Sequence, residues 1–256
     1  MTGALTLHRV ADGVRRRLKY SGVRAEPGVV LRELHVGGHR LLLGDVDGSV
    51  AVEVVAGEVG EGAYDFRDIE LEPGDTVLDV GAHIGVVSIY LAKEHPDVTI
   101  LAFEPVPRVF ELLTANLRRN RVHNVIAFNL AVTADGRDID LVSHPGSNTG
   151  GGTAFVEQLD LAEHERVTVA STTLDRIMDE HHVTRCPLLK IDIEGGEYEV
   201  LYGAECLPRI ANIRGEFHEN RYLLGRGYSM DALLEHCDTV IGPGRTRFTR
   251  CFMPDV

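Results

Sequence analysis

The sequence has few of the features that mark membrane, disulfide-rich or nucleic-acid-binding proteins. No apolar run approaches the roughly 20 residues that a transmembrane helix needs, and the first twenty residues lack the apolar core of a signal peptide. The four cysteines show no C-x-x-C spacing, which indicates reduced, packed thiols rather than a disulfide framework or a metal knuckle. These absences predict a cytoplasmic protein with no membrane partner.

Basic residues are also in short supply. The chain has 26 lysines and arginines against 39 acidic residues, a formal net charge of −13. A negative surface repels phosphate backbones, so we expect no nucleic-acid partner and a small-molecule substrate instead.

What is present is enough apolar material for one substantial core, with 44% hydrophobic residues in 256. Residues 1–70 are expected to form an extension that contains a helix within residues 5–20 and an antiparallel β-meander from Val29 to Ala56. Gly37-Gly38 and Asp47-Gly48, which separate the apolar runs of this meander, are hairpin signals. Residues 71–256 are expected to form the ligand-binding domain. The oligomeric state stays open, a homo-oligomer included.

The most informative stretch runs from Asp75 to Glu104. Two apolar runs, Thr76 to Val80 and Val98 to Phe103, flank a helical segment from Val86 to Lys93, which is the pattern of a βαβ unit. Gly81 and Gly85 fall where the first strand turns into the helix, and glycine permits a close approach of ligand or backbone there. The fold class is therefore α/β with a parallel sheet.

The acidic residues of this unit predict the ligand. Glu104 follows the second strand, where a carboxylate can accept hydrogen bonds from both hydroxyls of a ribose. The turn reads G-x-x-x-G and not G-x-G-x-x-G, which disfavours a dinucleotide. Asp79 would repel a pyrophosphate but attract the ammonium of an amino-acid group, directly or through water. A ligand that uses both carboxylates is S-adenosylmethionine.

The sequence resembles the FkbM-type class I methyltransferases in an ordered set of segments. They are PGDTVLDVGAHIG (73–85), AFEPVPRVFELLTANLRRN (102–120), NVIAFNLAV (124–132), TTLDRIM (172–178), LLKIDIEGGEYEVLYGA (188–204) and GEFHE (215–219). The family commonly carries Asn where this chain has His83, and either side chain can form hydrogen bonds.

The resemblance implies a Rossmann-like, seven-stranded class I methyltransferase sheet whose last strand is antiparallel. Asp238 to Ile241 and Thr246 to Phe252 are expected to form this closing hairpin. The cofactor-binding residues implied for S-adenosylmethionine are Asp79, Gly81, His83, Gly85, Glu104, Ala131 and Asp192, with Ala131 on the adenine side.

Methyl transfer to a hydroxyl requires positioning of the acceptor and removal of its proton. Candidates at the ends of the later strands are Asp192, Glu216 and His218, and His218 is predicted to be the base because its usual pKa is about 6.5. These three residues could also hold a divalent metal ion, which the sequence leaves open. Gly150 to Gly152 belong either to a flexible linker or to a flap over the site, with strands expected on both sides at 138–142 and 166–170.

The expected activity is S-adenosylmethionine-dependent O-methylation of a small specialised metabolite or a sugar-containing precursor, with oxygen as acceptor implied by the family. N-methylation, carboxyl O-methylation and NAD(P)-dependent oxidoreduction are the alternatives.

Overall fold

The computed structural model describes residues 24–62, 64–143 and 165–252 of the chain. The helix predicted within residues 5–20 and the segment around Gly150 to Gly152 lie outside the described residues. Among the described helices, none combines the length and the apolar character that a bilayer span needs.

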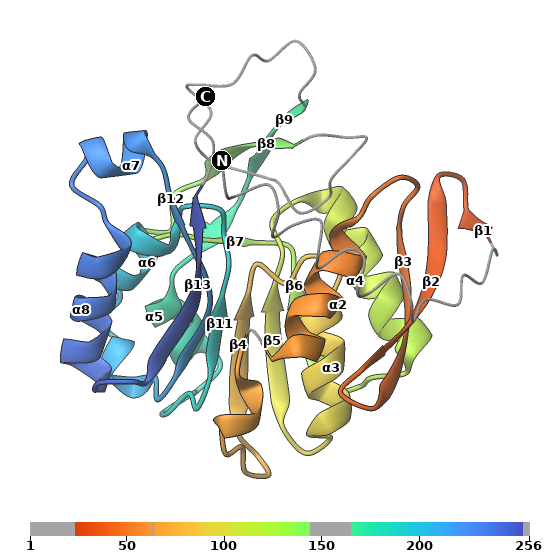
Figure 1. Cartoon of the computed structure of the whole chain (residues 1–256), viewed down its shortest axis with the longest axis horizontal. Helices are drawn as coiled ribbons and strands as arrows, with labels where there is room; N and C mark the ends of the chain where they lie inside the picture. The colour runs from red at the N-terminus through yellow and green to blue at the C-terminus, as the bar shows by residue number, and fades with distance from the viewer. Residues whose placement is uncertain (1–23, 63, 144–164, 253–256) are drawn as a thin grey trace.

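A six-stranded parallel sheet, in the order β13-β12-β11-β4-β5-β6, forms the centre of the fold (Figure 1). Its strands are β4 (Thr76–Val80), β5 (Thr99–Phe103), β6 (Val125–Phe128), β11 (Leu189–Ile191), β12 (Ile213–Glu219) and β13 (Thr246–Phe252). The strand order reverses direction between β4 and β11. Ligands of open α/β sheets bind outside the carboxyl ends of the strands at such a switch point.

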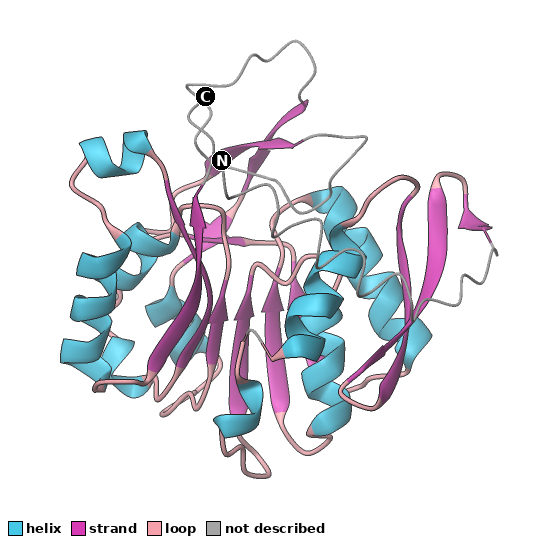
Figure 2. Ribbon diagram, in the orientation of Figure 1, coloured by secondary structure: helices cyan, strands magenta, loops and turns pink. Residues whose placement is uncertain are grey.

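Helices cover both faces of the sheet, which makes three layers (Figure 2). One face is covered by α2 (Ala51–Glu61), α3 (Val86–Glu94) and α4 (Pro107–Asn120), and the other by α5 (Leu174–Glu180), α6 (Glu197–Gly203) and α8 (Met230–Ile241). Alternate strand residues point to opposite faces. Val77 and Ile100 accordingly join the apolar cluster of the first face, whereas Leu78 and Leu101 join that of the second.

Shorter elements complete the fold. They are the 3-10 turns η1 (Phe66–Asp68) and η4 (Leu207–Arg209), the helix α7 (Arg221–Gly225), the parallel pair β7 (Ala131–Val132) and β10 (Ser171–Thr172), and the antiparallel pair β8 (Ile139–Ser143) and β9 (Glu165–Val169). The β8–β9 pair confirms the two strands predicted near residues 138–142 and 166–170.

The N-terminal extension is partly as predicted. β1 (Arg24–Glu26), β2 (Val29–Val36) and β3 (His39–Val46) form an antiparallel sheet with the expected turn at Gly37-Gly38. The third run of the predicted meander is wrong, since its residues form α2. Leu41 and Leu43 share one apolar cluster with Val77 and Ile84. The extension and the sheet therefore share a core, and the boundary at residues 70/71 stays a prediction.

The prediction of a carboxyl-terminal hairpin is also wrong. Asp238 to Ile241 end the helix α8, and β13 runs parallel to β12 over seven paired positions from Ile213↔Thr246 to Glu219↔Phe252. A helix between two strands crosses over the sheet and returns the chain in the same direction. In the described residues the sheet is thus six-stranded and parallel, without the seventh, antiparallel strand.

Candidate functional site

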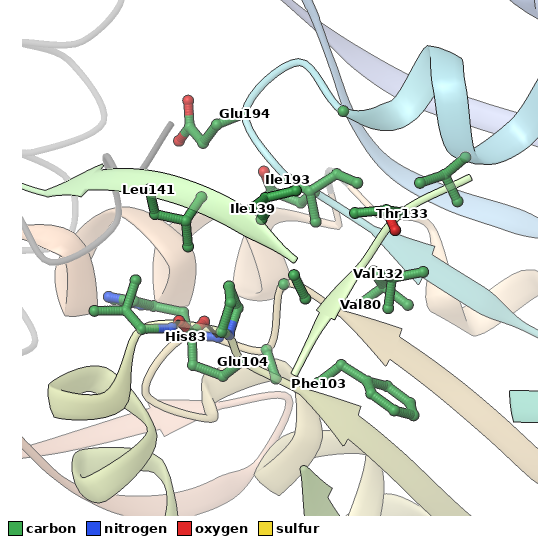
Figure 3. Close-up of a pocket in the computed structure, with 18 of the residues that line it drawn as sticks. Val80, His83, Phe103, Glu104, Val132, Thr133, Ile139, Leu141, Ile193 and Glu194 are labelled. Atoms are coloured by element: carbon green, nitrogen blue, oxygen red, sulfur yellow. Dashed lines mark hydrogen bonds between the residues drawn. The ribbon is translucent and has the colours of Figure 1, made fainter. Parts of the chain in front are cut away.

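A cavity of about 750 Å³ opens at the carboxyl ends of the sheet strands, within the range of about 300–1,000 Å³ typical of small-molecule sites. Its walls come from the ends of β4, β5 and β11 and from β7, β8 and α2. In Figure 3, His83 and Glu104 lie at one end of the cavity and Glu194 at the other, with Ile139 and Ile193 between them. The cavity therefore connects the two halves of the sheet at the point where the strand order reverses.

The turn after β4 brings the backbone close to β11. Gly81 has φ +78°, and a Cβ there would lie 1.8 Å from the carbonyl oxygen of Asp192, so only glycine fits. Gly85 has φ +92° and caps α3, and a Cβ there would lie 2.6 Å from Cδ1 of Leu113. Gly81 lines the cavity, whereas Gly85 is not among the described lining residues. Glycine is needed at position 85 because α3 packs closely against Leu113 there.

Glu104 is held at the end of β5 by two backbone amides. His83 N–H donates to Oε2 at 3.0 Å and Val106 N–H donates to Oε1 at 2.9 Å. The residue is 6% exposed and lines the cavity. Burial raises the pKa of the Glu104 carboxyl to about 7, although the two amides and Lys190 oppose the shift. The carboxylate predicted to bind a ribose is thus oriented before any ligand arrives.

Asp79 occupies a different environment from the one predicted. Its carboxylate is fully buried, accepts a hydrogen bond from Ser88 Oγ at 2.5 Å and lies 3.6 Å from Lys190 Nζ. It is not among the described residues that line the cavity. Lys190, which does line it, donates to the Gly81 carbonyl oxygen at 2.7 Å. Direct contact of Asp79 with a ligand ammonium would require its carboxylate to leave these partners.

Five of the seven predicted cofactor residues line the cavity. They are Gly81, His83, Glu104, Ala131 and Asp192. Ala131 belongs to the short strand β7, and the Asp192 side chain directly follows β11, where one carboxylate oxygen lies 3.6 Å from Lys190 Nζ. These positions agree with the predicted binding roles, which themselves stay predictions.

An acidic cluster surrounds His218 at the other end of the cavity. The imidazole Nε2 lies 3.5 Å from Glu194 Oε2 and 3.7 Å from Glu216 Oε2, and Nδ1 lies 3.1 Å from Glu197 Oε1. Cys251 donates from Sγ to Glu216 at 2.9 Å. Glu194 and Glu216 line the cavity, whereas His218 is buried and is not among the described lining residues. Of the predicted set, His218 shares one group of potential ligand atoms with Asp192 and another with Glu216.

The neighbours of His218 bear on its predicted role as the base. Burial alone would lower the pKa of the imidazole, but hydrogen bonds with Cys251 and Glu197 and the charges of Glu197 and Glu194 outweigh it and raise the pKa to about 12. A protonated imidazole has no lone pair with which to accept a proton. These neighbours thus oppose the role of general base, which for His218 stays a prediction. The neighbouring carboxyl of Glu194 has its pKa raised to about 7 by burial, against the opposing charge of His218.

Several lining residues carry no expectation from the sequence. Glu194 follows Asp192 at a spacing of two, a signal that could have placed both acids beside the strand end. Arg137 donates from Nη2 to Glu199 Oε2 at 2.7 Å across the cavity mouth, and Val50 and Val54 come from the segment interpreted as a strand. Arg137, Val50 and Val54 reach the cavity through tertiary packing, and no local sequence pattern indicates it.

The cavity has two polar ends and an apolar middle. More acidic than basic side chains line it, which favours a cationic group such as a sulfonium, while Phe103, Val132 and Leu141 offer an apolar wall for a flat ring. Glu104 supplies fixed acceptors for hydroxyl groups.

Comparisons with known proteins agree with this geometry. A family model described as "Methyltransferase FkbM domain" matches residues 79–241. The chain is 34% identical to the 31-O-demethyl-FK506 methyltransferase FkbM of Streptomyces tacrolimicus, over 63% of this chain and 72% of that protein. It is 28% identical to the hexuronic acid methyltransferase AglP of Haloferax volcanii, over 52% of each chain.

A solved structure, that of precorrin-6y C5,15-methyltransferase from Geobacter metallireducens GS-15, is 15% identical over 68% of this chain and 69% of that chain, with a TM-score of 0.39. The matched family region contains the β4–α3 turn, Glu104 and the acidic cluster up to Glu219. The chain therefore belongs to the FkbM methyltransferase domain family and is an S-adenosylmethionine-dependent methyltransferase.

Proposed function

We propose that the protein transfers a methyl group to a hydroxyl oxygen of a small molecule, either a specialised metabolite or a sugar-containing precursor. The observation that carries this proposal is the arrangement of Glu104 beside the Gly81 turn, in one cavity with a second group of carboxylates. The first end suits the donor and the second suits an acceptor.

The donor end fits S-adenosylmethionine. Each oxygen of Glu104 accepts one backbone N–H and retains lone pairs for ribose hydroxyls, since a carboxylate has about four acceptor positions. Ala131 and the apolar wall suit adenine, and Gly81, His83 and Asp192 line the region left for the methionine portion. The bound cofactor supplies the electrophilic methyl group.

At the acceptor end, Asp192, Glu194 and Glu216 line the cavity. Carboxylates can accept a hydrogen bond from an acceptor hydroxyl, orient its oxygen and share its proton as the oxygen becomes nucleophilic. We keep the catalytic roles predicted for Asp192 and Glu216, and His218 lies behind the cavity wall with Nε2 3.7 Å from Glu216 Oε2.

The relatives support an oxygen acceptor. One is named as a methyltransferase of a 31-O-demethyl compound and another as a hexuronic acid methyltransferase. The alternatives are N-methylation and methylation of a carboxylate, which needs no base. An NAD(P)-dependent oxidoreductase is disfavoured because the turn from Gly81 to Gly85 lacks the dinucleotide spacing.

Isothermal titration calorimetry tests the donor site. S-adenosylhomocysteine should bind the wild-type protein and NAD should not, while Glu104→Ala should weaken S-adenosylhomocysteine binding by about tenfold or more, since it removes acceptors of charge-assisted hydrogen bonds worth roughly 1.5–3 kcal/mol. Arg108→Ala, an exposed change in α4, is the control and should bind normally. Binding of NAD, or an unchanged Kd in Glu104→Ala, would contradict the proposal.

The acceptor class is tested with deuterated-methyl S-adenosylmethionine and mass spectrometry. Glucuronic acid offers both hydroxyls and a carboxylate, and glucosamine adds an amine. A labelled product that survives mild alkali is an ether or an amine, whereas a methyl ester is hydrolysed. Label on glucuronic acid that resists alkali is expected. If the label is only alkali-labile, the enzyme methylates a carboxylate. If the label is on the glucosamine nitrogen alone, it is an N-methyltransferase.

A further inference from the structure

The acidic cluster contains an imidazole whose two nitrogens have different partners. His218 is 4% exposed. Its Nδ1 faces Glu197, and its Nε2 faces Glu194 and Glu216. One ligand atom each from Asp192, Glu194 and His218 lies within 4.8 Å of the others.

Glu197 fixes which nitrogen carries the hydrogen. Its carboxylate is fully buried and accepts the backbone N–H of Ile193 at 2.9 Å and of Gly195 at 3.0 Å. A carboxylate bound in this way accepts and does not donate, so Nδ1 of His218 is the donor in their contact at 3.1 Å. In a neutral imidazole the lone pair is then on Nε2, which points toward Glu194 and Glu216.

A histidine that donates from one nitrogen to a buried carboxylate and presents the other to a group of oxygen ligands has the usual arrangement of a metal-binding histidine. Two further carboxylates around the same nitrogen bring more negative charge than one imidazole balances. The ammonium of Lys190 donates to the Gly81 carbonyl oxygen and lies 3.6 Å from one oxygen of Asp192, so it balances part of the charge of Asp192. A divalent cation at Nε2 would take the place of a proton there.

We propose that Asp192, Glu194 and Nε2 of His218 bind one divalent transition-metal ion, with Glu197 as the carboxylate that orients the imidazole. Glu216 lies 3.7 Å from the same nitrogen and forms, with His218 and Cys251, a second group of potential ligands. One nitrogen and several carboxylate oxygens suit Mn²⁺, with Zn²⁺ the principal competitor, whereas Mg²⁺ prefers oxygen and water ligands alone.

The position of the site gives the ion a function, and this part rests on the proposed O-methylation. Asp192 and Glu194 line the cavity at the acceptor end. A cation there can bind the acceptor hydroxyl and lower its pKa, so that the proton leaves to solvent and the oxygen is held for attack. The ion would supply the activation of the hydroxyl that His218 was predicted to provide.

Metal binding is tested by titration of the chelator-treated, dialysed protein with MnCl2 at pH 8, followed by the loss of the EPR signal of free Mn²⁺. We expect one Mn²⁺ per chain. Glu194→Gln and His218→Gln should each weaken the Kd at least about tenfold, the lower bound for changes even to the outer partners of metal ligands. Glu199→Gln removes a carboxylate from the same cavity but outside the cluster, and should leave the Kd of Mn²⁺ unchanged.

Calorimetry with S-adenosylhomocysteine on the same samples shows whether each variant is folded and separates the two proposals. If wild type binds neither Mn²⁺ nor Zn²⁺ but binds S-adenosylhomocysteine, the metal site is wrong and the methyltransferase assignment stands. Equal loss of Mn²⁺ binding in Glu199→Gln would also overturn the site. Mn²⁺ binding with alkali-stable product formed equally in EDTA would keep the site and remove its role in the reaction.

Discussion

At the scale of single residues, Glu104 has to be charged to serve a donor that offers hydroxyl hydrogens. Burial raises the pKa of its carboxyl to about 7. A proton on the carboxyl takes up one of the lone pairs that a ribose hydroxyl would use. Ligand binding and proton binding at Glu104 therefore compete in the neutral pH range.

We predict that the Kd of S-adenosylhomocysteine weakens about tenfold between pH 8 and pH 6. A carboxyl with a pKa near 7 is about 90% charged at the first pH and about 10% at the second, and only the charged form binds well. Calorimetry across this range measures the change. Glu104→Gln, which cannot titrate, should bind weakly with a Kd that does not vary with pH. A constant wild-type Kd would show that the ribose does not use this carboxylate.

The sequence identifies Glu104 and Gly81 because their positions follow directly from the ends of two strands. It cannot distinguish Asp79, which lies one residue before the strand end and points into the protein toward Ser88 and Lys190. The protonation of His218 is equally hidden, since Glu194 and Glu197 reach it from a different segment. Residue type and strand position predict where a side chain is, whereas its charge state depends on neighbours brought by the fold.

At the scale of elements, the helix α4 binds the edge of the N-terminal hairpin with side-chain amides. Asn116 is fully buried and accepts Gly44 N–H at 2.7 Å while donating to the carbonyl oxygens of Gly44 at 3.0 Å and Ile84 at 2.9 Å. One turn later, Asn120 forms the equivalent pair with Leu42 N–H and C=O. These amides take the place of a neighbouring strand and protect the edge of β3.

Asn116→Ala should lower the free energy of unfolding by about 2–4 kcal/mol, because it leaves buried backbone groups of Gly44 and Ile84 without their partner. Asn116→Asp should be at least as damaging, since it places a carboxylate against two carbonyl oxygens. Urea denaturation measures both. Arg108→Ala, on the exposed side of the same helix, should stay within about 0.5 kcal/mol of wild type. Equal stability of Asn116→Ala would show that the hairpin is held by apolar packing alone.

Elements whose apolar residues fit a single spacing, helical or strand-like, are predicted well. Elements whose apolar residues fit both spacings are not. The strands and the helix of the βαβ unit have the predicted bounds or differ by one residue. The run after Asp47-Gly48 alternates like a strand, yet Val52, Ala56 and Val59 also recur at helical spacing and are the buried face of α2. Packing of this segment against α3 stabilises the helix over the strand. Similarly, the parallel β13 follows from the crossover helix α8, which a hairpin interpretation of short apolar runs misses.

At the scale of the whole molecule, two apolar clusters share one sheet, and the cavity lies at the sheet edge between them. Its walls come from residues as far apart in the chain as Val50 and Arg226. The chain has a net charge of −13, and the residues that line the cavity likewise include more acidic than basic side chains. A small cationic donor is favoured by this field, and a phosphate backbone is opposed by it.

Because distant segments share one cavity, donor binding should stabilise them together. Saturation with S-adenosylhomocysteine is expected to slow amide hydrogen exchange in segments 80–87, 103–106, 130–133 and 190–194, which line the cavity, and in the helix α2 behind Val50 and Val54. The hairpin β2–β3 and α8 contribute no described lining residue and are the internal controls. Exchange that slows locally in the first two segments alone would mean that the donor occupies only the β4–β5 side of the sheet. Slowing that extends to 190–194 would require the ligand to bridge the point where the strand order reverses, and only this outcome brings its reactive end toward Asp192 and Glu194.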